Sequence, residues 1–402
     1  MWATALLAGC ASFGPVLPTT TTDSGEPAEI AFSVRTLGPD GEFTLRPSAE
    51  VARQLQASFG ERPLSILALS SGGSSGAFGA GALVGSTSGG ARPEFMVVTG
   101  VSAGALLAPF AFLGAEWSAQ MTEIFTTGAT DDLLQPRVFG VLFGSSVYRG
   151  EPLRRLIERY ADDDMVAAVA VEASKGRLLL VATTDFASGE PVIWDLGSVA
   201  LHGGRDAKRL FQTLLLASAS IPGMLPPVVV KFRSQDRTHV ETHVDGAVTL
   251  SFFIAPAAAD LPHSTSSTPR AIVRVIINGP LRDPPRRTHA NALSIFKRSL
   301  SAGLSHMTRA TLQSTVDALR QRGIALDYAA IPALYPLSDA FIFEPHTEHS
   351  LFEYAASCAA SGRLWIHVHS SDDAAVAERA SASAPMCPVD DTFIGSFAAL
   401  GN

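Results

Sequence analysis

Short apolar runs alternate along the chain with longer stretches in which apolar residues recur at helical spacing. Residues 65–70, 95–99 and 178–184 are compact apolar runs, typical of strands buried on both faces. The first two runs are each followed by a glycine-rich turn and then by small and apolar residues that favour a helix, over 77–83 and up to Phe112. This alternation predicts an α/β fold with helices packed on a central sheet.

The same pattern continues through the second half of the chain. Further strands are predicted at residues 191–196, 228–232, 240–244, 271–278 and 364–369. Helices are predicted at residues 152–160, 207–217, 293–322 and 350–363. The three aspartates at 162–164 are interpreted as a solvated loop, and residues 257–270, rich in Ala, Ser, Thr and Pro, as another loop.

Composition excludes several classes of protein. The 402 residues are 47% hydrophobic and 17% charged, which is enough apolar material for a large core. The net charge of −8 and the lack of a Lys/Arg run argue against a nucleic-acid partner and against charge-driven docking on anionic lipid. Residues 97–115 carry no charge, but Gly100, Gly104 and Pro109 divide them into strand, turn and helix rather than a membrane span.

The N-terminal segment has the features of an export signal. Residues 1–10 form a short apolar stretch that ends in Leu7-Ala8-Gly9-Cys10, which resembles the bacterial lipobox. Residues 11–29, rich in Pro and Thr, are predicted to be a flexible tether, and residues 30–400 the folded domain. This predicts a lipoprotein anchored through Cys10 in the bacterial cell envelope, facing the periplasm. An unmodified apolar tail on a cytoplasmic protein is the alternative.

The remaining cysteines and the histidines give no metal site. Cys358 and Cys387 either pair in an oxidising compartment or remain two free thiols. The ten histidines are scattered, and no Cys/His cluster has the spacing of metal ligands. We therefore expect neither a metal nor a cofactor. The sequence does not define an oligomeric state.

The segment Gly100-Val101-Ser102-Ala103-Gly104 lies between a predicted buried strand and a predicted helix. This is the context that a G-x-S-x-G nucleophile elbow requires, because the tight turn needs small flanking residues and lifts Ser102 Oγ out of the sheet. The following helix favours negative charge at its N-terminus. Ser102 is therefore the candidate nucleophile.

A serine hydroxyl needs a base, and the chain offers two kinds. His346, His367 and His369 come late, as in a His-containing triad, but none lies in a characteristic local pattern. Asp245 follows a predicted strand and precedes Gly246, which leaves room for its carboxylate to face a cleft. Partial desolvation would raise its pKa and make it a better base. The structural alternative for Asp-Gly is a plain turn.

A third segment, residues 70–76, is a glycine-rich turn between a strand and a helix. Such a turn exposes consecutive backbone N–H groups to an anion. It lacks the Gly-Lys-Ser/Thr ending of a phosphate-binding P-loop. Its amides could instead stabilise the oxyanion of an acyl-transfer reaction.

These segments, in this order, resemble the patatin-like phospholipase family. That family has a glycine-rich oxyanion motif, a G-x-S-x-G elbow and a D-G-[GA] motif, matched here by residues 70–76, 100–104 and 245–247. A fourth match is 217–227, which resembles the family's A-S-x-A-x-P-x-x-F-P-P stretch. The resemblance covers residues 64–252. It implies a three-layer α/β/α fold with a mostly parallel sheet, and a Ser102–Asp245 catalytic dyad without histidine.

Two positions depart from the family pattern. Ser71 replaces the first glycine of the oxyanion motif, and Ser75 replaces the usual basic residue, whereas Gly72 and Gly73 are kept as candidate oxyanion donors. The expected activity is hydrolysis of fatty-acyl esters of phospholipids, lysophospholipids or acylglycerols, with residues 134–150 as a candidate lid. A serine esterase with a His-containing triad, an acyl transferase and a non-catalytic lipid-binding lipoprotein are the alternatives.

Overall fold

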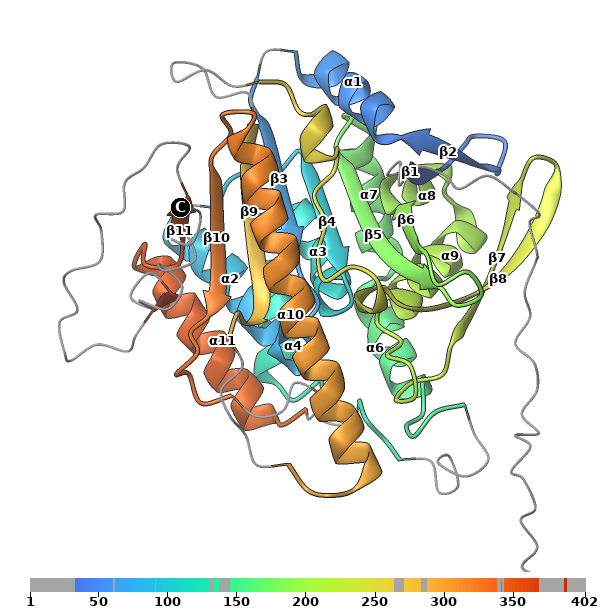
Figure 1. Cartoon of the computed structure of the whole chain (residues 1–402). Coiled ribbons are helices and arrows are strands. Elements are labelled where there is room, and N and C mark those ends of the chain that lie inside the picture. The colour runs from blue at the N-terminus through green and yellow to red at the C-terminus, as the bar shows by residue number, and fades with distance from the viewer. Residues whose placement is uncertain are drawn as a thin grey trace, which may run out of the picture.

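The fold is an eleven-stranded sheet between two layers of helices, seen in a computed structural model (Figure 1). The structure describes residues 33–60, 62–90, 92–130, 133–136, 145–263, 271–282, 288–337, 341, 343–368 and 387–388. The predicted signal at 1–10, tether at 11–29 and anchor residue Cys10 lie outside these residues, as does part of the candidate lid.

The strands follow one another in the sheet in an order that places the parallel ones at its centre. The strands are β1 (Ser33–Leu37), β2 (Phe43–Pro47), β3 (Leu64–Leu69), β4 (Val97–Val101), β5 (Leu178–Asp185), β6 (Pro191–Asp195), β7 (Val228–Ser234), β8 (Arg237–Asp245), β9 (Ala271–Pro280), β10 (Leu326–Ile331) and β11 (Ile366–Val368). Neighbours run β11-β10-β9-β3-β4-β5-β6-β1-β2, and β8 pairs with both β5 and β7. The five strands from β10 to β5 are parallel, while β11, β6 and β8 join them in antiparallel pairs.

Helices cover both faces of this sheet. They are α1 (Ser48–Phe59), α2 (Gly76–Ser88), α3 (Ala103–Leu113), α4 (Ser118–Thr126), α6 (Glu151–Tyr160), α7 (Asp163–Ser174), α8 (Leu196–His202), α9 (Gly204–Ser218), α10 (Ala292–Arg320) and α11 (Pro345–Ala360). Among the described helices, none has both the length and the apolarity that crossing a bilayer requires.

Side chains of the central strands alternate between two apolar cores. In β3, Ile66 and Ala68 belong to the core that also holds residues of α1 and α10, whereas Leu67 and Leu69 belong to the core with residues of α2, α3, α9 and α11. Figure 1 shows these helices over the sheet. The three-layer α/β/α architecture predicted from the sequence is confirmed. Burial on both faces explains why the central strands are nearly continuous apolar runs.

Some local predictions were wrong or incomplete. The aspartates at 162–164 do not form a loop: α7 begins at Asp163, and the side chain of Asp162 accepts the Met165 N–H at 2.9 Å as an N-cap. The sequence patterns also gave no indication of β1, β2, β10, α1, α4 or α8.

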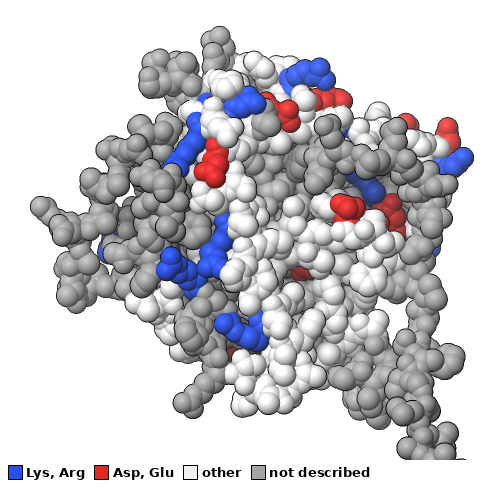
Figure 2. All heavy atoms as spheres, viewed as in Figure 1, with Lys and Arg blue, Asp and Glu red and all other residues white. Residues whose placement is uncertain are grey.

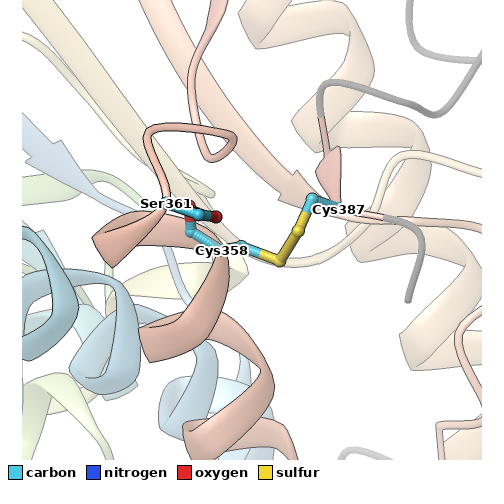
Figure 3. The surroundings of a disulfide bond; sticks show 3 residues. All are labelled: Cys358, Ser361 and Cys387. Atoms are coloured by element: carbon cyan, nitrogen blue, oxygen red, sulfur yellow. Dashed lines mark hydrogen bonds between the residues drawn. A yellow bond between two sulfur atoms is a disulfide. The ribbon is translucent and has the colours of Figure 1, made fainter. Parts of the chain in front are cut away.

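The two C-terminal cysteines are paired. Cys358, near the end of α11, forms a disulfide with Cys387, with their Cα atoms 5.6 Å apart (Figure 3). The hydroxyl of Ser361 donates to the carbonyl oxygen of Cys358 at 3.1 Å. Of the two alternatives for these cysteines, the structure therefore has the pair.

Candidate active site

Ser102 occupies a sharp turn between β4 and α3. Its φ of 55° and ψ of −121° lie in a region that residues other than glycine rarely adopt. A Cβ added at Gly100 would lie 2.5 Å from the carbonyl oxygen of Gly104, and one added at Gly104 would lie 2.3 Å from that of Leu69. Both flanking positions therefore require glycine, and the turn has the geometry of a nucleophile elbow.

The strands β4 and β8 pair with the same edge of β5, which brings their ends together. β4 runs parallel to β5 as far as the pairing of Val101 with Ala182. β6 pairs with the opposite edge of β5, so β8 continues along the β4 edge, in the antiparallel direction, and ends with Asp245 opposite Thr183. Ser102 directly follows Val101. The first residue after β4 and the last residue of β8 are thereby brought face to face.

The side chains of Ser102 and Asp245 are in direct contact. Ser102 Oγ donates to Asp245 Oδ2 at 2.6 Å, across 143 positions of sequence. The other carboxylate oxygen, Oδ1, accepts the backbone N–H of Ala247 at 2.8 Å. Only 5% of Ser102 and 2% of Asp245 is exposed.

Burial changes the proton affinity of the Asp245 carboxyl. It raises the pKa of Asp245 from its ordinary value of 3.8 to about 7, although the hydrogen bonds from Ser102 and Ala247 act to lower it. A carboxylate with this pKa accepts a proton near neutral pH far more readily than an exposed aspartate does. The pair is therefore suited to general-base activation of a hydroxyl.

The C-terminal end of α9 fixes the backbone of both residues. The hydroxyl of Ser218 accepts the N–H of Ser102 at 3.0 Å and donates to the carbonyl oxygen of Ala182 on β5 at 2.7 Å. Two residues later, the carbonyl oxygen of Ser220 accepts the N–H of Asp245 at 2.9 Å. The motif at residues 217–227 thus has a physical role, since it sets the separation between the hydroxyl and the carboxyl.

The glycine-rich loop lies beside this pair. Gly72 and Gly73 line the same cavity as Ser102 and Asp245. Within the described part of the chain, neither glycine amide donates to another group, whereas the Ser71 amide donates to the Ser251 carbonyl oxygen at 2.9 Å. Two N–H groups remain for an anion at the cavity wall, as an oxyanion hole requires.

Asn278, in β9, holds this loop and was not identified from the sequence. Its Nδ2 donates to the Ser70 carbonyl oxygen at 2.8 Å, its backbone N–H donates to Ser70 Oγ at 2.9 Å, and its Oδ1 accepts the Gly79 N–H at 2.9 Å. A Cβ at Gly72 would lie 2.3 Å from the Asn278 carbonyl oxygen. The only sequence signal was a polar residue that ends an apolar strand.

The two late candidate histidines that the structure describes, His346 and His367, do not line this site. His346 is exposed on α11, and His367 Nδ1 lies 2.6 Å from Asp327 Oδ1 at the edge of the sheet. His369 lies outside the described residues. Among the residues that the structure describes, no histidine lines the cavity of Ser102 and Asp245.

One other group of titratable side chains is close enough to consider for a metal. Ligand atoms of Asp185, Glu241 and His243 lie within 4.8 Å of one another. Glu241 Oε2 accepts from Arg35 Nη1 at 2.6 Å and lies 3.0 Å from His243 Nε2, and Asp185 Oδ2 accepts from the Ser188 hydroxyl at 2.7 Å. Because these partners occupy the ligand atoms, the group is explained as a buried polar network rather than a metal site.

Comparison with known proteins agrees with this geometry. Residues 67–258 match the family model described as patatin-like phospholipase. This segment is a patatin-like phospholipase domain. The crystal structure of VipD from Legionella pneumophila is similar at 10% identity, covering 86% of this chain and 73% of that one, with a TM-score of 0.31. No curated protein sequence matches the chain.

Proteins of the patatin-like phospholipase family are in general hydrolases that act on lipid esters, and residues 67–258 are the segment that matches this family. Ser102, Asp245, Gly72 and Gly73 all lie within the matched segment. Asn278 and the cavity-lining part of α10 lie outside it. The site is therefore completed by a part of the chain that the family model does not cover.

The raised pKa of Asp245 predicts how one substitution changes stability with pH. A carboxyl whose pKa is raised on folding stabilises the fold fully below its unfolded pKa, 3.8, and this contribution is lost as the pH rises to about 7. Asp245→Asn should therefore change the free energy of unfolding little at pH 4 and increase it at pH 8, by roughly 2 to 4 kcal/mol. Urea unfolding at the two pH values measures this. Asp206→Asn, at an exposed carboxylate, is the control, and equal effects of Asp245→Asn at both pH values would contradict the account.

Proposed function

We propose that this chain is a serine lipid acyl hydrolase in which Ser102 and Asp245 act as a catalytic dyad. The observation that carries the proposal is the 2.6 Å contact between Ser102 Oγ and the desolvated carboxylate of Asp245. The cavity that both residues line, without a described histidine, favours this dyad over a His-containing triad.

In the first step, Asp245 accepts the proton of Ser102 Oγ as that oxygen attacks the carbonyl carbon of the ester. The amides of Gly72 and Gly73 donate to the oxyanion that forms, with the Ala103 amide at the N-terminus of α3 as a further donor. When the tetrahedral intermediate collapses, the protonated Asp245 returns its proton to the leaving alcohol. An acyl ester of Ser102 remains.

In the second step, Asp245 accepts a proton from water, and the resulting hydroxide attacks the acyl carbon. The same amides stabilise the second oxyanion. Collapse of this intermediate breaks the bond to Ser102 Oγ, which takes the proton back from Asp245 as the fatty acid leaves. A pKa of about 7 suits Asp245 to both directions of proton transfer.

The cavity wall favours a fatty-acyl substrate with little charge near the ester. Apolar side chains from five segments line it, among them Ile221, Val248, Ile277, Leu300, Leu304, Leu337 and Phe341. In the described lining, Asp245 is the one charged side chain, so no cation is placed there to pair with a phosphate. Acylglycerols, which carry no phosphate, therefore fit at least as well as phospholipids and lysophospholipids.

We further propose that the protein is exported as a lipoprotein and anchored at Cys10. The lipobox-like residues 7–10 and the Pro/Thr-rich segment that follows support export. The Cys358–Cys387 disulfide agrees with it, because such bonds persist mainly in oxidising compartments such as the periplasm.

Ser102→Ala should abolish hydrolysis of a p-nitrophenyl acyl ester and of monoacylglycerol while the thermal unfolding profile stays cooperative. The hydroxyl is the only nucleophile in the proposed mechanism, so a loss of at least about 10³-fold in kcat is expected. A fluorophosphonate probe should label the wild type at Ser102. Turnover by Ser102→Ala at the wild-type rate, or a wild type that the probe does not label, would reject the dyad. An unlabelled wild type that still binds lipid would favour the non-catalytic alternative.

Asn278→Ala should lower kcat by about 100-fold and leave KM nearly unchanged, because the side chain of Asn278 is bonded to the glycine-rich loop and to α2 after it, and acts by positioning the oxyanion donors. Steady-state kinetics on the same ester measures the two parameters separately. Ser198→Ala is a matched control, since it removes buried hydrogen bonds to Leu37 and Asp195 elsewhere in the fold. The control should keep the wild-type kcat. An unchanged kcat in Asn278→Ala would show that Asn278 only stabilises the fold.

Cys10→Ser should abolish incorporation of labelled palmitate when the full chain is expressed in a bacterium with lipoprotein-processing enzymes. The mass of the N-terminal peptide should show an acylated Cys10 in the wild type. Labelling of the Cys10→Ser variant, or an unmodified Cys10 in the wild type, would contradict the anchor.

A further inference from the structure

Helix α10 carries one row of apolar residues, interrupted only by Thr308, whose surroundings change along its length. Leu312, Val316 and Leu319 are buried in the core under the sheet. About two and three turns from Leu312 towards the N-terminus, Leu304 and Leu300 line the cavity of Ser102 and Asp245. The row thus leads from the core directly into the candidate active site.

The row does not stop at the cavity. Continuing at the same helical spacing, Phe296 and Leu293 follow Leu300, and they are 43% and 36% exposed. Ile295, on the adjoining face, is 53% exposed. Three large apolar side chains within one turn of helix, continuous with a ligand cavity, are a recognised mark of an interaction surface.

Contacts place this end of α10 beside the entrance of the cavity. A Cβ at Gly223 would lie 3.8 Å from the Phe296 ring, and the preceding residue, Pro222, lines the cavity. Val248 also lines the cavity and is 46% exposed. We call the set Val248, Leu293, Ile295 and Phe296 the rim patch.

The charge of the helix differs from that of the whole chain. Although the chain carries a net −8, the charged side chains from Ala292 to Val316 are Lys297, Arg298 and Arg309, all basic, and the first acidic one is Asp317. Lys297 Nζ lies 5.8 Å from the centre of the Tyr148 ring, next to the exposed apolar turn. Figure 2 shows this face: the surface around the lower end of α10 is largely uncharged, and Lys and Arg side chains lie along one side of the helix.

We propose that the rim patch docks on the surface of an anionic lipid bilayer or micelle and that acyl chains enter the cavity along α10. An amphipathic helix with exposed apolar residues and flanking Lys or Arg is the arrangement that binds in the plane of such a surface. From Leu293 to Leu304 the row provides roughly 17 Å of helix along which an acyl chain can pass from the lipid to the cavity. The entry of acyl chains rests on the proposed hydrolase function, whereas docking does not.

The test measures binding to sedimented vesicles of equal parts phosphatidylcholine and phosphatidylglycerol, without turnover. The parent is the Ser102→Ala protein lacking residues 1–29, so that no acyl anchor contributes. Adding Leu293→Ser, Ile295→Ser and Phe296→Ser should lower the partition coefficient on the order of 100-fold, because three apolar side chains no longer enter the lipid. Vesicles of pure phosphatidylcholine should bind the parent more weakly than the anionic ones.

The matched control is the triple change Leu45→Ser, Val171→Ser and Leu201→Ser. These side chains are 51% to 66% exposed, against 36% to 53% for the three changed in the rim patch, but they lie on β2, α7 and α8 and do not line the cavity. The control should bind as the parent does. A parent that does not bind vesicles, or equal losses in the two triple variants, would overturn the proposal. Because no ester is cleaved, neither result depends on whether the chain is a hydrolase.

A second measurement covers the case in which the rim triple variant does not fold, as judged by its thermal unfolding. Ile295→Trp in the same parent should show tryptophan emission that is quenched by brominated phosphatidylcholine in the anionic vesicles. Val171→Trp, on α7, should add no quenched emission. If both changes behave alike, α10 does not enter the lipid and the proposal is wrong.

Discussion

The hydrogen bond between Ser102 and Asp245 depends on a carboxylate kept away from water, and much of the surrounding structure serves that condition. Burial raises the pKa of Asp245 to about 7, which turns a weak base into one matched to neutral pH. The carboxylate is stable there because each of its oxygens accepts a hydrogen bond, one from Ser102 and one from Ala247. Burying the carboxyl of Asp245 costs free energy of folding, which the rest of the fold offsets. The resulting rise in its pKa acts on one atom, Ser102 Oγ.

The sheet supplies the geometry of this contact. β4 and β8 share one edge of β5 and meet end to end, and Ser218 and Ser220 at the end of α9 hold the two backbones at a fixed separation. On the other side of the hydroxyl, Asn278 holds the loop whose amides face the cavity. Three separate elements thus fix the proposed nucleophile, base and oxyanion donors, so none of them relies on a flexible loop alone.

Local sequence patterns predicted the parts of the site but not their assembly. Buried strands and the elbow at Ser102 follow from composition and from the need for glycine at 100 and 104, which the structure explains by backbone contacts. Local patterns made Asp245 one candidate base beside the late histidines, and only the resemblance to a family motif selected it, because the antiparallel approach of β8 to β5 is a long-range contact. Asn278 and β10 were missed, since a lone asparagine and the sequence Leu-Asp-Tyr-Ala-Ala-Ile have no distinctive periodicity. Asp162 shows that a charge run can be a helix N-cap rather than a loop.

The central claim, that Asp245 is the desolvated base for Ser102, is tested most directly by the pH dependence of fluorophosphonate labelling at Ser102. Labelling reports the reactivity of the hydroxyl without substrate release or lipid binding. The second-order rate constant of the wild type should rise with pH through a single ionisation near 7, and Asp245→Asn should label slowly at every pH. A midpoint close to the ordinary aspartate value of 3.8, or an Asp245→Asn variant that labels as fast as the wild type, would contradict it.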